Sequence, residues 1–270
     1  MRMPYTLLFA SLLTAGVLYA QSLPAKVSVD FDEPIADDST TTYGDLIRLI
    51  CPGLEINSQK PSEATGSDCI AHRVMEAGMD PSTWEGVLFK DLSRIPAKTL
   101  GKDRMLVSFE GSDNTRGLGV ALFEILPKPK LLDVIETTGA PDCAPSLYYD
   151  LPLAGGAEVL GFGSAHGNVG FADEQITLVS VRDNHLEKIT SVWLQSCSRT
   201  AFGYPGGCEA EKSDVERSLA ATSPGGVLQL RVTEKRRATR TYTATYQWDP
   251  ASKRYRATSD ALAGFTGEHR

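Results

Sequence analysis

The sequence predicts an α+β protein that is predominantly antiparallel β, a meander forming a twisted sheet, sandwich or partly open barrel with two short N-terminal helices. Three observations support this fold class. Helical periodicity is confined to two short stretches before residue 86. After it, short β-branched or alternating runs are separated by turn residues. No long helix alternates with these runs, which excludes a doubly wound α/β sheet.

The first 20 residues have the pattern of a secretory signal peptide. Arg2 supplies a positive charge, and residues 6–17 form an apolar run that is short for a membrane span. Cleavage after Ala20, or alternatively after Ala25, leaves about 250 residues for one β-rich domain over 21–270. No other apolar run approaches the length of a span, so we expect no stable membrane span after cleavage and a periplasmic or secreted product. A retained, uncleaved anchor is the alternative.

An alternating segment and a short helix are expected at the start of the mature chain. Residues 26–31 alternate apolar and polar side chains, as a half-buried strand does. Thr41 or Thr42 is placed to cap a helix over residues 43–50, and Pro52 stops it. The apolar side chains of this helix supply its buried face.

A second short helix is expected over residues 68–77, with Gly78 in the C-terminal position. The chain then becomes a series of strands separated by turns. Strands are predicted at residues 104–110, 118–126, 131–137, 158–163, 175–182, 186–194, 227–233, 239–248 and 254–258. A subdomain boundary is possible near residues 139–156, where proline and glycine are frequent.

Two hairpins are specified by their turn residues. Asp183-Asn184 joins the strands on either side of it, and Asp249-Pro250 joins the last two strands. Alternate residues of the 239–248 strand then form an aromatic face that can meet Tyr255 across the turn: Tyr242, Ala244, Tyr246 and Trp248. Cross-strand packing in a core explains this face more simply than a stacking platform for sugars or peptides.

Five cysteines in an exported chain indicate disulfides. Cys197 and Cys208 are the strongest pair, because they bracket a glycine-rich loop. Cys51 and Cys69 flank another turn-rich segment and form the second candidate pair. Cys143 is left over, either as a buried, inert thiol or as a reactive or intermolecular one. Spacing alone does not settle the connectivity.

The glycine-rich segment at residues 155–171 is the most suggestive stretch for chemistry. It contains Ser164 and His166, but its spacing matches neither a dinucleotide fingerprint nor a hydrolase elbow. The two residues could still act as nucleophile and base if a carboxylate oriented the imidazole. The candidates for that carboxylate are Asp150, Asp173 and Glu174. Alternatively, the glycines shape a bulged strand end or a wide turn.

An acidic cluster near the N-terminus offers oxygen ligands for calcium. It consists of Asp30, Asp32, Glu33, Asp37 and Asp38. The spacing lacks the glycine and the terminal glutamate of an EF-hand. A solvated acidic linker is the simpler interpretation. None of the four histidines has zinc-site spacing, and we expect no bound cofactor.

Two further segments are candidate contact surfaces. Phe202 and Tyr204 lie in the loop between Cys197 and Cys208, where a disulfide would pre-order them for a partner. A basic cluster is either a contact for an anionic polymer or lipid headgroup, or a charged hairpin tip. It consists of Lys235, Arg236, Arg237 and Arg240.

These observations favour an exported, non-enzymatic protein that binds an envelope or extracellular protein or a small ligand. An extracytoplasmic hydrolase using Ser164, His166 and a carboxylate such as Asp173 is the second hypothesis. A calcium-dependent structural module is the third. The net charge of −7 argues against nucleic acid as the partner.

Overall fold

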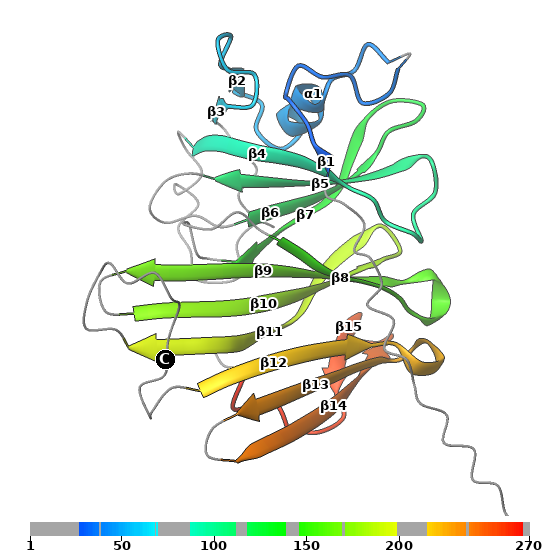
Figure 1. The fold of residues 1–270 in the computed structure, drawn as a ribbon. Coiled ribbons are helices and arrows are strands. Elements are labelled where there is room, and N and C mark those ends of the chain that lie inside the picture. The colour runs from blue at the N-terminus through cyan, green and yellow to red at the C-terminus, as the bar shows by residue number, and fades with distance from the viewer. Residues whose placement is uncertain are drawn as a thin grey trace, which may run out of the picture.

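The structure is a computed structural model that describes residues 27–37, 39–67, 69, 87–111, 118–138, 146–168, 171–198, 215–235 and 238–266. Every strand pairing among them is antiparallel. The strands form two sheets that lie one after the other along the molecule (Figure 1). The predicted β-rich antiparallel class is therefore confirmed.

The first sheet has seven strands. Its strands are β1 (Val27–Ser28), β2 (Glu55–Ile56), β3 (Ala64–Gly66), β4 (Val87–Ile95), β5 (Arg104–Gly111), β6 (Leu118–Glu124) and β7 (Lys130–Thr138). The order is β2-β3-β4-β5-β6-β7, and β1 also pairs with β4. Central strands of this sheet are buried on both faces, since Met105, Val107 and Phe109 alternate with Leu106 and Ser108 and all five are buried.

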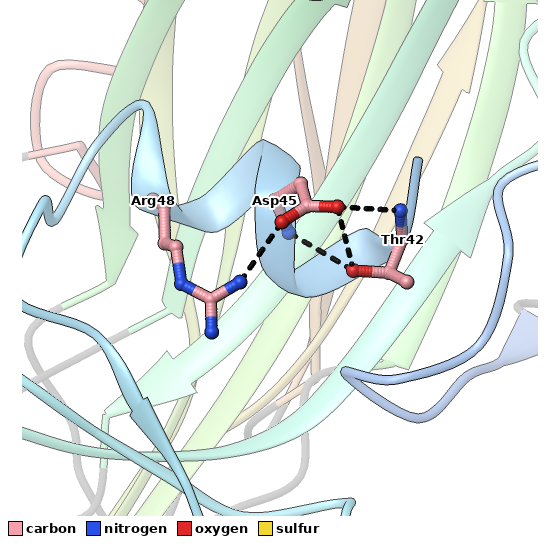
Figure 2. A network of polar contacts seen from close by, with 3 residues as sticks. All are labelled: Thr42, Asp45 and Arg48. Atoms are coloured by element: carbon pink, nitrogen blue, oxygen red, sulfur yellow. Dashed lines mark hydrogen bonds and ion pairs between the residues drawn. The ribbon is translucent and has the colours of Figure 1, made fainter. Parts of the chain in front are cut away.

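One face of the first sheet is covered by α1 (Tyr43–Arg48). Thr42 caps this helix: its Oγ1 accepts a hydrogen bond from the Asp45 N–H at 3.2 Å, and Asp45 Oδ2 accepts the Thr42 N–H at 3.0 Å. Figure 2 shows this reciprocal pair, with Arg48 donating to the second Asp45 oxygen. The Thr42 N–H lowers the pKa of Asp45 most strongly. The predicted cap and helix are thus confirmed.

A disulfide links Cys51 to Cys69 beneath α1. Cys51 is fully buried in the same core as Leu46, Ile47 and Phe89. This bridge confirms one of the two predicted pairs. It ties the segment after the helix to the residues that follow β3.

The second sheet has eight strands in sequential order. They are β8 (Ser146–Pro152), β9 (Glu158–Asn168), β10 (Phe171–Arg182), β11 (His185–Ser198), β12 (Val215–Thr222), β13 (Leu228–Lys235), β14 (Thr239–Asp249) and β15 (Arg254–Ala257). Single 3-10 turns at Ala154–Gly156 and Pro224–Gly226 precede β9 and β13. The structure therefore continues as a meander to its last strand.

The inner face of β12–β15 encloses a second core. Tyr246 and Tyr255 are buried there, as the predicted aromatic face requires, and the Trp248 and Tyr255 rings lie 5.2 Å apart. The C-terminal segment completes this core through Phe265, whose carbonyl accepts the Trp193 N–H at 3.0 Å. The aromatic side chains of β14 are core residues here.

A third core joins the two sheets. Leu106, Val120 and Leu122 of the first sheet pack against side chains from β9, β10 and β11. The residues contributed by the second sheet are Leu160, Phe162, Val179, Val181 and Leu186. Because β9 and β10 also send Val159, Ile176 and Leu178 into the core of the second sheet, these strands are buried on both faces.

Several strand boundaries differ from the sequence-based prediction. β4, β8 and β12 were not predicted, and β8 lies within residues 139–156, which were expected to form a loop. A register shift interrupts the alternation in β4. In β12, Arg217 occupies the same alternate positions as Leu219 and Ala221, so neither strand has a clear period of two in hydrophobicity. Residues 26–31 form only the short β1, with Val27 exposed.

The glycine-rich segment also differs from the simpler interpretation. β9 runs regularly to Asn168 and pairs with β10 without a register shift, so no bulge or wide turn interrupts it there. Gly161 and Gly163 are paired with neighbouring strands on both edges of β9, and Gly167 is paired with Ala172 of β10. The predicted second helix, residues 68–77, lies outside the described residues apart from Cys69.

The two predicted hairpins are present, with one correction. Asp183 and Asn184 both have positive φ, 50° and 62°, as a two-residue type I′ turn requires. The last hairpin has a longer loop than predicted, because Asp249 pairs with Arg254 and Lys253 takes a φ of 51°. Asp249 stabilises this loop by accepting the Ala251 N–H at 3.0 Å.

Replacing Cys51 with Ala should lower the free energy of unfolding by about 3 kcal/mol, since the bridge closes a loop with a sequence separation of 18. The Cys51→Ala/Cys69→Ala double variant should lose nearly the same amount, because either change removes the same cross-link. Urea denaturation of the unchanged chain, Cys51→Ala, Cys69→Ala and the double variant measures this. A loss in the double variant equal to the sum of the two single losses would contradict a shared bridge.

Candidate functional site

A cleft opens where loops of the two sheets meet. Its volume is about 260 Å³, and it is lined by Thr99, Asp103 and Arg104 from the first sheet and by Gly156, Arg182 and Asn184 from the second. The first group lies in and after the connection from β4 to β5. The second lies at the turn before β9 and at the tip of the β10–β11 hairpin. The cleft is therefore polar and shared by both sheets.

Arg104, at the start of β5, joins the two walls of the cleft. Its Nε donates to Asn184 Oδ1 at 2.9 Å. Its guanidinium group also pairs with Asp103 and lies 3.6 Å from Glu124. Arg104 is only 19 % exposed, so it is a positioned cation that holds the hairpin tip against the first sheet.

Arg182, the last residue of β10, is the second cation of the cleft. Its guanidinium carbon lies 4.5 Å from the centre of the Trp248 ring, within cation–π distance. Its side chain is 20 % exposed, and its buried Nε has no hydrogen-bond acceptor among the described residues; Asp183 lies 3.6 Å away. Gly155, at φ 75°, lets this guanidinium approach closely, because a Cβ there would come within 3.0 Å of it.

Glu187 lies in β11 beside β15. Its Oε1 accepts the Tyr255 N–H at 3.0 Å, and its buried Oε2 has no hydrogen-bond partner in the described part of the chain. Burial raises the pKa of Glu187 to about 7, although the Tyr255 N–H and the Arg254 charge oppose this rise. Burial likewise raises the pKa of Tyr255, against a hydrogen bond with Arg182.

Two buried carboxyl groups meet at the turn between β8 and β9. Glu158 accepts the Lys98 N–H at 2.9 Å, the Thr99 N–H at 3.0 Å and the Thr99 hydroxyl at 2.8 Å. Burial raises its pKa, and a hydrogen bond with Asp150 raises it further. Asp150, only 1 % exposed, pairs with Lys98 Nζ at 2.8 Å. These groups fix the loop that forms one wall of the cleft.

Asp133 of β7 makes a second attachment between the sheets. Its carboxylate is 1 % exposed and accepts the Leu186 N–H at 2.9 Å and the Val134 N–H at 3.0 Å. His185 contacts the same carboxylate through Nδ1 and is half exposed. A buried carboxylate of the first sheet thus holds the start of β11, next to the Asp183-Asn184 turn.

The predicted catalytic residues lie elsewhere, in the paired part of β9 and β10. The ladder places His166 directly opposite Asp173, and Ser164, two residues before His166, opposite Gln175. Glu174 is opposite Ala165. Asp150 is opposite Leu160, six residues before His166, and is held by Lys98 instead. Of the three candidate carboxylates, the backbone register brings Asp173 to His166.

The predicted contact loop lies outside the described residues. This applies to Phe202, Tyr204 and Cys208, and also to Cys143. Cys197 lies in β11, where its backbone is paired with Ala172.

The acidic segment is exposed where it is described. Asp30, Asp32, Glu33 and Asp37 are all exposed, and Glu33 accepts the Asp30 N–H at 3.3 Å. Within the described ranges, no group of three His, Cys, Asp or Glu side chains is arranged to hold a metal ion. Asp38 lies outside those ranges.

Sequence reasoning did not identify the residues of the cleft. Arg104 and Asn184 are 80 residues apart, and no local spacing connects them. The nearest signal was the Asp183-Asn184 turn, which predicted a hairpin tip but not the surface against which it packs.

Comparison of the chain with protein-family models, with curated proteins and with solved structures finds no match. No helix among the described residues is long and apolar enough to cross a membrane.

The raised pKa of Glu187 predicts a pH-dependent stability. Between about pH 4.5 and 7 the folded protein binds more protons than the unfolded chain, so the free energy of unfolding should fall as the pH rises through this window. Glu187→Gln should reduce this slope and stabilise the protein above pH 7. Glu158 acts in the same direction, so the slope should not vanish.

Urea denaturation at pH 5 and pH 8 measures this effect. Glu55→Gln, which changes an exposed glutamate of β2, is the matched control and should leave the slope unchanged. An unchanged slope in Glu187→Gln would show that this carboxyl group is not held in its neutral form.

Proposed function

We propose that the protein is an exported, non-enzymatic binding protein that takes a small anionic ligand in the cleft between its two sheets. The observation that supports this most directly is the pair of guanidinium groups, Arg104 and Arg182, that line one cleft from different sheets. Arg182 lines the cleft and its guanidinium group carries further N–H donors for such a ligand, whereas its buried Nε has no acceptor among the described residues.

The distribution of charge with depth favours an anion. Arg104 and Arg182 are 19 % and 20 % exposed, whereas the side chains of Asp103 and Asp183 are 51 % and 83 % exposed. Solvent screens the exposed carboxylates more strongly than the half-buried cations. A ligand in the cleft would therefore compete with solvent-exposed carboxylates for two shielded guanidinium groups.

Three other carboxyl groups near the cleft have structural partners. Asp133 and Glu158 accept hydrogen bonds from backbone N–H groups of the opposite sheet, and Asp150 pairs with Lys98. The cleft volume lies slightly below the range of drug-sized pockets, so the ligand would be small. A binding role fits this arrangement better than catalysis in the cleft. An envelope partner at Phe202 and Tyr204 remains a separate proposal.

Replacing Arg182 with Met should weaken binding of a small carboxylate by about 10-fold to 100-fold, because a charge-assisted hydrogen bond is lost from a shielded site. Calorimetric titration with succinate, citrate, glutamate and inorganic phosphate measures this. Lys60→Met, at an exposed cation between β2 and β3 that lies outside the cleft lining, is the matched control. A folded Arg182→Met protein that binds as tightly as the unchanged chain would contradict the proposal.

A hydrolase is the second candidate, and the ladder register favours it. Directly opposite residues of an antiparallel pair have Cβ atoms about 4.5–5.5 Å apart, which is compatible with a hydrogen bond between an imidazole and a carboxylate. His166 and Asp173 are such a pair, with Ser164 on the same strand as His166.

This candidate predicts covalent labelling by a fluorophosphonate probe, in which Ser164 Oγ attacks phosphorus and fluoride leaves. Labelling should be lost in Ser164→Ala and fall by about 100-fold or more in His166→Ala. Ser218→Ala, at an exposed serine of β12, is the control and should be labelled normally. Mass spectrometry of the intact protein reports the adduct, and an unlabelled wild-type chain would contradict the hydrolase.

A further inference from the structure

Charge is distributed unevenly along the chain. Residues 215–266, which include β12–β15, contain nine Lys and Arg against four Asp and Glu, a net charge of +5. The rest of the chain has eighteen against thirty, a net charge of −12. The acidic average of the whole protein therefore conceals a basic C-terminal unit, which forms the lower part of the molecule in Figure 1.

The outer face of this unit is rich in hydroxyl groups. Alternation places one set of β14 side chains in the core and the other set outside. Four threonines of the outer set span about 20 Å along the strand: Thr239, Thr241, Thr243 and Thr245. Neighbouring strands add Ser218, Thr222, Gln229, Thr233 and Gln247 to the same face.

Cations lie on both sides of the threonine row. Arg231 of β13 is opposite Thr243, and Arg256 of β15 is opposite Gln247. Arg231 and Arg256 are exposed, as is Arg254. No ion pair engages Arg231 within the described part of the chain, whereas Arg256 Nε lies 3.1 Å from Asp249.

Among the described outer positions of these strands, carboxyl groups occur at the two ends of the face. Asp249 ends β14, and Glu216, near the start of β12, is opposite Lys235 in the ladder. Between these ends the described outer positions carry hydroxyl, amide and guanidinium groups, with a single alanine, Ala220.

The aromatic residues of these strands point inward. Tyr242, Tyr246, Trp248 and Tyr255 belong to the core on the other side of the sheet. The described outer positions of β12–β15 therefore lack the aromatic anchors on which nucleobases stack, and the apolar centre that protein interfaces require. This composition separates the face from the two commonest kinds of macromolecular interface.

We propose that the outer face of β12–β15 binds an acidic polysaccharide. Guanidinium groups bind carboxylate or sulfate oxygens in a bidentate manner, and threonine and glutamine side chains exchange hydrogen bonds with sugar hydroxyls. A row of such groups along one strand suits an extended polymer. This site is separate from the cleft and goes beyond the proposed small-ligand function.

Binding of the full mature chain to immobilised alginate and heparin tests the proposal, with uncharged dextran and duplex DNA as comparison probes. Arg231→Gln/Arg254→Gln/Arg256→Gln removes three cations from the face. Lys102→Gln/Lys128→Gln/Lys130→Gln removes three exposed cations from the first sheet and is the matched control. Thr241→Val/Thr243→Val removes hydroxyls while keeping β-branched side chains.

The unchanged chain should bind both acidic polysaccharides but not dextran, and the affinity should fall as ionic strength rises. The arginine variant should lose about 10-fold in affinity, and the lysine control should lose little. The threonine variant should weaken binding without changing its salt dependence.

Three results would overturn the proposal. One is equal loss in the arginine and lysine variants, which would place binding elsewhere or make it a general charge effect. Another is tighter binding of duplex DNA than of either polysaccharide, which would identify a nucleic acid as the partner. The third is failure to bind either acidic polysaccharide at low ionic strength. Circular dichroism of each variant establishes that it is folded.

Discussion

The burial of β9 over residues 158–163 and of β10 over residues 176–181, on both faces, is the constraint on which the rest of the structure depends. One face of these stretches packs into the core of the second sheet, and the other packs against the first sheet through Leu160, Phe162 and Val179. A stretch buried on both faces has no exposed row of side chains in which to place polar groups. Next to these stretches, exposed polar groups therefore occur at the strand ends and turns, where the cleft lies.

At these strand ends, hydrogen bonds to buried carboxyl groups hold the two sheets together in place of apolar contacts. Asp133 and Glu158 each accept hydrogen bonds from backbone N–H groups of the opposite sheet. Each carboxyl group therefore fixes the position of one backbone segment. Apolar packing between sheets is tolerant of small shifts, whereas hydrogen bonds to a buried carboxylate are directional. The carboxylates therefore determine how the hairpin tip and the Thr99 loop meet, and the geometry of the cleft follows from them.

Local signals were sufficient for those parts of the fold that local contacts determine. The Thr42 cap, the Asp183-Asn184 turn and the alternation of β14 could all be predicted, since each depends on residues within one turn or strand. β8 was missed because it begins in a segment interrupted by proline and glycine. The cleft was not predictable in the same way, because its walls are brought together by the packing of two sheets and no local spacing encodes that contact.

The net charge of the whole chain says little about the electrostatic potential at one face, for a physical reason. At physiological ionic strength the field of an exposed charge decays over about 8 Å, so a ligand responds to the nearest residues and not to the whole chain. Around Arg231 those residues are uncharged or basic, although the protein is acidic overall. The acidic average of the chain therefore does not describe the field around β12–β15, where positive charge exceeds negative charge. The side chains that lie between the cations would determine which anionic partner fits this face. On β14 these side chains are threonines, which carry hydroxyl groups, and not aromatic residues.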